Sequence, residues 1–178
     1  MARWIALLRG INVGGRAKVP MAELKALCED LGWKEVRTFI QSGNVVFDAG
    51  GDGERLEAAL EDALEKRFGF RPAVMMRSAD AWRAMLAANP FGNEAEEAPA
   101  LVHVGVSKAP PAAGAAASLE SRGKAGERVR EAGGVLWFHF PDGAGRSKLT
   151  PALIDKAAGS PVTARNWRTA LALGDMTG

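Results

Sequence analysis

The stretch VRTFIQSGNVVFD, residues 36–48, decides how the surrounding sequence folds. Val36, Thr38 and Ile40 alternate with Arg37, Phe39 and Gln41, and a second apolar run begins after Asn44. Between them, Ser42-Gly43 is typical of a tight turn. The stretch therefore predicts two antiparallel strands joined as a β-hairpin.

The segments on both sides of this hairpin have helix and strand patterns. Residues 3–9 and 73–77 are apolar runs typical of strands. Apolar residues spaced three and four apart predict one helix before the hairpin and one after it; they are Leu24, Leu27, Cys28 and Leu31, then Leu56, Leu60, Leu64 and Phe68. Gly32 and Gly69 are expected to end these helices. Residues 1–89 thus have the predicted order βαββαβ.

The second half of the chain repeats this order. Ser78 is a predicted cap for a helix that stops before Asn89-Pro90, and residues 90–100 are predicted as a linker. The elements expected beyond it are strands near 101–106, 127–131, 135–140 and 161–164, and helices near 113–122, 150–159 and 167–173. We therefore predict an α+β protein of two tandem ferredoxin-like units with antiparallel sheets, residues 1–89 and 101–178.

This topology brings polar loops together at the sheet ends. The first and third strands of a split βαβ unit are central, so the loop Gly10–Lys18 and the turn Gln41–Asn44 are expected to be neighbours. In the second unit, the loop 141–149 and Arg165-Asn166 are expected to form another polar cluster.

Composition excludes several classes of protein. The 178 residues, 47% of them hydrophobic, are enough to bury a core. The single cysteine rules out an intrachain disulfide and a cysteine-based metal cluster. No apolar run approaches the length of a membrane span, and a net charge of +2 gives no basic excess of the kind that duplex nucleic acid attracts. We expect a cytoplasmic protein with no membrane association; the composition does not indicate an oligomeric state.

Four segments resemble the bacterial domain of unknown function 1697 family. They are LLRGINVGGRAKVPMAELKAL, VRTFIQSGNVVF, GRSKL and TARNW. The resemblance implies a two-part α+β fold with a ferredoxin-like first part, and it implies no activity. The signature positions carried here are Arg9, Gly10, Asn12, Gly14, Gly15, Gln41, Ser42, Gly43, Asn44, Arg165, Asn166 and Trp167.

The glycine-rich loop is not a nucleotide-hydrolase motif. Gly10 and Gly15 have the spacing of the P-loop glycines, but Arg16 occupies the lysine position. Ala17 stands where a hydroxyl would bind magnesium. The dinucleotide fingerprint also fails, because Asn12 replaces its second glycine.

What remains is a candidate anion site. The glycines can expose backbone N–H groups, and the expected cap residue of the first helix, Val19, has no side-chain acceptor. Arg9 and Lys18 would add charge-assisted hydrogen bonds to an anion held by Gly14-Gly15 and the helix start. The alternative is that the glycines only permit positive φ angles and that water satisfies the helix end.

Other polar residues have two interpretations. Asn12, Gln41, Ser42 and Asn44 would orient a ligand beside the loop, or they serve the turn alone. Arg165 and Asn166 would contact ligand, or Asn166 caps the last helix.

The remaining candidate groups favour structural roles. His103 and His139 lie on adjacent predicted strands and would be able to pair, yet two histidines without carboxylates make a poor metal site, so we predict no metal. Cys28 is expected to be a buried small hydrophobe. The aromatic strand with Trp137 and Phe138 is either core or a base-stacking surface, and core packing is favoured.

The sequence therefore predicts a protein that binds a small anionic ligand, bearing phosphate or carboxylate, at its glycine-rich loop. The predicted ligand-binding residues are Arg9, Gly10, Asn12, Gly14, Gly15, Lys18, Gln41, Ser42, Asn44, Arg165 and Asn166. No catalytic nucleophile and base pair is evident, and no cofactor is expected. The alternatives are a group-transferring enzyme with a composite site from both halves, an RNA-binding module, and a protein-interaction module that uses an exposed sheet.

Overall fold

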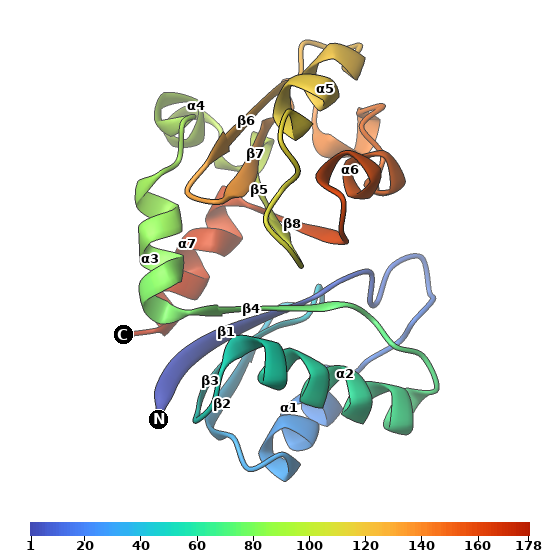
Figure 1. Cartoon of the computed structure of the whole chain (residues 1–178), viewed down its shortest axis with the longest axis vertical. Coiled ribbons are helices and arrows are strands. Elements are labelled where there is room, and N and C mark those ends of the chain that lie inside the picture. The colour runs from blue at the N-terminus through green and yellow to red at the C-terminus, as the bar shows by residue number, and fades with distance from the viewer. The chain divides into compact units, whose positions relative to one another are not determined.

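The computed structural model describes all 178 residues and divides into two units. Unit 1 consists of Met1–Trp82 together with Leu173–Gly178, and unit 2 consists of Arg83–Ala172. Each unit contains one four-stranded antiparallel sheet (Figure 1). The predicted α+β class is confirmed.

Unit 1 contains the first βαββαβ motif. Its elements are β1 (Ala2–Leu8), α1 (Met21–Asp30), β2 (Lys34–Phe39), β3 (Asn44–Ala49), α2 (Gly53–Phe68) and β4 (Val74–Ser78). The strand order β2-β3-β1-β4 puts the first and third strands in the centre. This is the ferredoxin-like order that the sequence predicts.

Unit 2 repeats the motif. Its sheet and the helices of the repeat are β5 (Val102–Ser107), α5 (Ala115–Arg122), β6 (Arg128–Ala132), β7 (Val135–His139), α6 (Pro151–Ala158) and β8 (Val162–Asn166). The strand order β6-β7-β5-β8 again places the first and third strands in the centre. The remaining elements of the chain are α3 (Ala79–Ala87), α4 (Gly92–Glu97), α7 (Trp167–Met176) and two short 3₁₀ turns, Pro99–Leu101 and Ala144–Arg146.

Local capping sets several helix boundaries. The hydroxyl of Ser78 accepts from the amide of Ala81 at 3.2 Å, and that of Thr150 accepts from Leu153 at 3.3 Å. At the other end, Gly69 closes α2 with a φ of 81°, a left-handed conformation that costs glycine little. The predicted roles of Ser78 and Gly69 are confirmed.

Helices α1 and α2 cover one face of the unit 1 sheet with a packed apolar core. Trp33 stacks on Phe47 with ring centroids 4.0 Å apart. Cys28 is fully buried in this core, and burial raises the pKa of its thiol to about 12. The thiol therefore stays protonated and unreactive at neutral pH, as expected of a small hydrophobe.

The aromatic strand of unit 2 is core. Trp137 and Phe138 are fully buried, and Phe140 is 4% exposed. Phe138 stacks on Phe140 at 5.5 Å between ring centroids, in the cluster that α5 and α6 cover. These rings present no surface on which bases could stack.

Residues 90–100, which the sequence predicts as a linker, contain α4 and a 3₁₀ turn. Phe91 and Ala95, four residues apart, are 2% and 3% exposed and anchor the segment. Glu94 pairs with Arg128 at 2.6 Å. Because the segment is polar overall, its sequence does not indicate that Phe91 and Ala95 are buried. These two residues determine its local structure.

Three of the four edge strands have a backbone amide bonded to a carboxylate from a helix. Glu57 of α2 accepts from the amide of Met76 in β4 at 2.9 Å. Glu120 of α5 accepts from Val129 in β6 at 3.0 Å, and Asp155 of α6 accepts from Val162 in β8 at 2.9 Å. The fourth edge strand, β2, has an irregular register between Lys34 and Arg37. Capped and bulged edges resist pairing with further strands.

Candidate functional site

The glycine-rich loop folds as a small hairpin. Arg16 donates its amide to the carbonyl of Val13 at 3.0 Å, and Gly14 and Gly15 form the tip with φ angles of 58° and 73°. Positive φ at both central residues is the signature of a type I′ turn. Asn12 then donates its amide to the carbonyl of Ala17 at 3.0 Å. The glycines are thus needed for this tip.

Asn12 joins this loop to the β2–β3 hairpin. Its Oδ1 accepts from the amide of Val19 at 2.8 Å, and its Nδ2 donates to the carbonyls of Val19 at 2.9 Å and Gln41 at 2.8 Å. Leu8 adds a backbone bond to the carbonyl of Gly43 at 2.9 Å. The two segments are neighbours, as the topology predicts, and the Asn12 side chain is used within the protein.

The start of α1 has no side-chain cap. Its N-cap residue is Pro20, with φ −61° and ψ 137°, and not Val19 as the sequence suggests. Val19 is held out of the helix because Asn12 binds both its N–H and its carbonyl. Proline has no N–H and no side-chain acceptor. The amides of Met21, Ala22 and Glu23 therefore have no acceptor in the protein.

An open groove of about 460 Å³ lies at this helix start. Its lining residues are Asn12, Gly15, Lys18, Pro20, Met21 and Gln41. The ammonium of Lys18 and the side-chain amide of Gln41 are exposed and have no partner in the protein. The groove thus combines a cation, a free amide and a helix N-terminus, and all three favour a negatively charged group. Sequence reasoning missed Met21 and its two following residues as donors, although Pro20 signalled the helix start.

Ser42 and Asn44 have structural roles in the β2–β3 turn. Asn44 is fully buried, and its Nδ2 donates to the carbonyl of Phe39 at 2.8 Å and to Ser42 Oγ at 3.0 Å. A Cβ on Gly43 would come within 2.6 Å of Ile11 Cδ1. Ile40 adopts a φ of 51°, which is a strained conformation for a β-branched residue. The turn is therefore closely fitted to the glycine-rich loop.

Arg9 and Gly10 lie at the end of β1, outside the lining of the groove. Arg9 donates its backbone amide to the carbonyl of Ala73 at 2.9 Å. Gly10 is exposed with a φ of 68°. Of the predicted ligand-binding residues in unit 1, only Asn12, Gly15, Lys18 and Gln41 line the groove.

Arg165 and Asn166 have structural partners within unit 2. Arg165 is 7% exposed, and its guanidinium donates to Thr163 Oγ1 at 2.6 Å and to the carbonyl of Ala164 at 3.0 Å. Burial lowers the pKa of its guanidinium to about 10. Asn166 Oδ1 accepts from the amide of Thr169 at 3.0 Å and so caps α7. In the loop 141–149, Ser147 donates to Glu127 at 2.8 Å.

The two histidines do not pair. His103 stands opposite Phe138 in the sheet, and His139 stands opposite Val102. Directly opposed residues share a face, so this one-residue offset sends the two imidazoles to opposite faces. The expectation that they would be able to pair is wrong for this reason. No group of three or more His, Cys, Asp or Glu side chains is placed to hold a metal ion.

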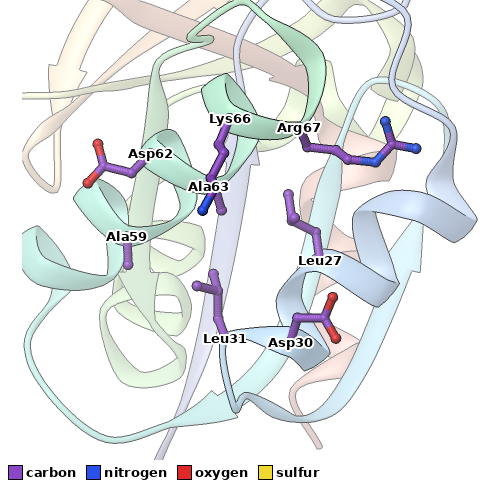
Figure 2. Close-up of a pocket in the computed structure, with 8 residues that line it drawn as sticks. All are labelled: Leu27, Asp30, Leu31, Ala59, Asp62, Ala63, Lys66 and Arg67. Atoms are coloured by element: carbon purple, nitrogen blue, oxygen red, sulfur yellow. The ribbon is translucent and has the colours of Figure 1, made fainter.

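A second groove, which sequence reasoning missed, lies between α1 and α2 (Figure 2). Its volume is about 630 Å³, and its lining residues are Leu27, Asp30, Leu31, Ala59, Asp62, Ala63, Lys66 and Arg67. The available signal is Ala59 and Ala63, which are spaced four apart beside a leucine stripe. Small side chains at that spacing leave room between two helices.

Comparison with known proteins agrees with this architecture. A structure described as that of a conserved bacterial protein from Streptococcus pneumoniae is similar to the whole chain, with a TM-score of 0.79, 26% sequence identity and 99% of each chain covered. No curated protein matches the sequence. The family described as protein of unknown function DUF1697 matches residues 1–137, a range that holds the glycine-rich loop, the β2–β3 hairpin and both grooves of unit 1. With most of its length matched in this way, the chain belongs to the DUF1697 family.

Proposed function

We propose that unit 1 binds a small molecule bearing a phosphate or carboxylate group in the groove at the start of α1. The observation that carries the proposal is the uncapped helix start, whose first three amides have no acceptor in the protein. Their N–H groups and the helix dipole favour a negatively charged group.

Two side chains complete the proposed site. Lys18 supplies a cation without an ion pair, and Gln41 supplies an amide with free donors. Gly15 lets the backbone approach the ligand closely because it has no Cβ. At about 460 Å³, the groove has room for more than a single phosphate, so Gln41 would contact the rest of a larger molecule.

One carboxylate lies close to the proposed site and is already paired. Glu23, in the first turn of α1, pairs with Arg67 of α2. This pairing offsets the charge that would otherwise repel an anion at the same helix start. Arg67 therefore supports the site indirectly.

Three observations favour this proposal over the alternatives. Arg165, the residue suggested for a composite transferase site, is buried and bonded within its own strand. The aromatic rings suggested for base stacking are buried. Three of the four edge strands that a partner strand would need are capped by Glu57, Glu120 and Asp155, and the fourth, β2, is irregular in register.

A titration with inorganic phosphate, followed through backbone amide NMR shifts, tests the proposal. Phosphate should shift the amides of Met21, Ala22 and Glu23 and that of Gly15 in a saturable way. Lys18→Gln should weaken the apparent affinity about five- to tenfold, because an exposed charge-assisted contact is lost.

Lys34→Gln is the matched control. Lys34 is an exposed lysine of the same unit, lies outside the groove, and carries the same charge. The proposal is wrong if these amides do not respond to phosphate, or if the Lys34 and Lys18 variants lose affinity equally, since the effect would then come from net charge alone.

A further inference from the structure

The groove between α1 and α2 is separate from the proposed anion site and shares no lining residue with it. Leu27 of α1 and Leu31, the residue that follows α1, face Ala59 and Ala63 of α2 across it (Figure 2). These four side chains are only partly buried. The centre of the groove is therefore apolar and accessible to a ligand.

Only one of the four charged residues at the rim turns its charged end into the groove. In Figure 2 the side chain of Lys66 runs over the groove, with its nitrogen beside Ala63, while the charged ends of Asp30, Asp62 and Arg67 point away. Asp62 pairs with Arg71 at 2.5 Å, and Arg67 pairs with Glu23. Lys66 and Asp30 have no ion pair, and of these two only Lys66 turns its charged end into the groove. A single unpaired cation thus stands over an apolar floor.

The fold alone does not produce a groove of this size. The equivalent helices of unit 2, α5 and α6, leave a cleft of only about 190 Å³ between them. That cleft is lined by Leu119 and Leu153 and by two cations, Arg122 and Lys156. The groove of unit 1 is therefore larger and more apolar than its counterpart in unit 2, although small residues, Ser118 and Ala157, line that cleft as well.

We propose that this groove binds an aliphatic monocarboxylate, with the hydrocarbon chain on the Leu27, Leu31, Ala59 and Ala63 surface and the carboxylate on Lys66. The charge pattern selects this ligand, since a lone cation complements a single anionic head and the floor complements a chain. From Ala59 to Lys66 the groove runs along seven residues of α2, or about 10 Å. That distance is comparable to the extended length of octanoate.

Calorimetric titration with butyrate, hexanoate, octanoate and octanol tests this proposal. Full burial of a methylene corresponds to about fourfold in affinity, and in a groove that is open on one side we expect roughly twofold per added methylene. Lys66→Gln should weaken octanoate binding about fivefold and leave octanol binding unchanged. Ala63→Leu, which fills the groove with a residue that favours helix, should weaken both ligands.

Lys34→Gln again serves as the charge-matched control and should bind octanoate as the unsubstituted protein does. Affinity that does not depend on chain length would overturn the proposal, because the carboxylate would then be bound without the groove. Equal losses in the Lys66 and Lys34 variants would overturn it as well. So would a dimer, seen by sedimentation, that Ala63→Leu dissociates, because a second copy of the chain would then fill the groove.

Discussion

Asn12 satisfies three polar groups of the surrounding backbone with one side chain. Its amide oxygen and nitrogen bind both polar groups of Val19 and the carbonyl of Gln41. Its own φ of 55° is a conformation that asparagine tolerates better than most residues. Asn12 therefore acts as a scaffold that holds the glycine-rich loop against the β2–β3 turn, which leaves Lys18 and Gln41 available for a ligand.

His103 is a titratable residue whose environment opposes its charged form. Its ring lies 5.2 Å from that of Phe140 between centroids, and its Nδ1 is buried without a hydrogen-bond partner. Burial lowers the pKa of its imidazole to about 4, from an ordinary value of 6.5. The folded state thus takes up this proton only at much lower pH than the unfolded state does.

This difference predicts an acid-dependent loss of stability. Since the folded pKa lies below the unfolded one, the contribution is fully present above about pH 6.5 and is lost as the pH falls toward 4. It amounts to at most about 3 kcal/mol. The free energy of unfolding, measured with urea from pH 7 to pH 4, should therefore fall less steeply in His103→Gln than in the unsubstituted protein. Parallel curves would show that His103 does not titrate in this way.

At the scale of single elements, carboxylates on the helices accept hydrogen bonds from amides of the edge strands. Glu57 reaches from α2 to the amide of Met76 and is itself only 8% exposed. In unit 2, α5 and α6 cap β6 and β8 with Glu120 and Asp155. Each helix thus covers its sheet face and also satisfies an edge amide that would otherwise be open to another strand.

Removing one such cap should destabilise the protein measurably. Glu57→Ala leaves the amide of Met76 without its acceptor and should lower the free energy of unfolding by about 1–3 kcal/mol. Glu54→Ala, on the exposed side of the same helix, should cost about 0.5 kcal/mol or less. Urea unfolding of both variants measures the difference. Equal effects would mean that the carboxylate of Glu57 contributes only as a surface charge.

At the scale of the whole molecule, both ends of the chain belong to unit 1 (Figure 1). The last six residues, Leu173–Gly178, belong to the same unit as β1. Leu173 is fully buried, and Arg37 of β2 donates to the carbonyl of Met176. Unit 1 is therefore built from two separate parts of the sequence. None of the helices combines the length and the apolar character needed to cross a membrane.

Deletion of residues 173–178 should consequently lower the melting temperature. Loss of a buried leucine alone costs about 2–5 kcal/mol, and each kcal/mol corresponds to about 2–4 °C in a chain of this length. We expect a decrease of at least about 4 °C in a calorimetric scan. Deletion of Gly178 alone, which is exposed, is the control. An unchanged melting temperature after the longer deletion would show that the C-terminal residues do not stabilise unit 1.

Much of this architecture can be predicted from local patterns. Periodicity of Leu56, Leu60 and Leu64 identifies α2, and Ser42-Gly43 identifies the turn between β2 and β3. Patterns of this kind along the whole chain predict the repeated βαββαβ order. The topology that follows from this order predicts that the glycine-rich loop lies next to residues 41–44. Such features depend on neighbours in the sequence, whose side-chain spacing repeats with the period of a helix or a strand.

Tertiary structure alone decided which polar groups remain available. The role of Asn12 depends on Gln41, 29 residues away, and the burial of Arg165 depends on the packing around β8. The one-residue register offset that separates His103 from His139 is likewise absent from either strand's own pattern. Residue types determined the elements of this protein, because those follow from local spacing. Contacts between distant segments determined which donors, cations and apolar surfaces a ligand can reach, because burial and hydrogen bonding are properties of the packed chain.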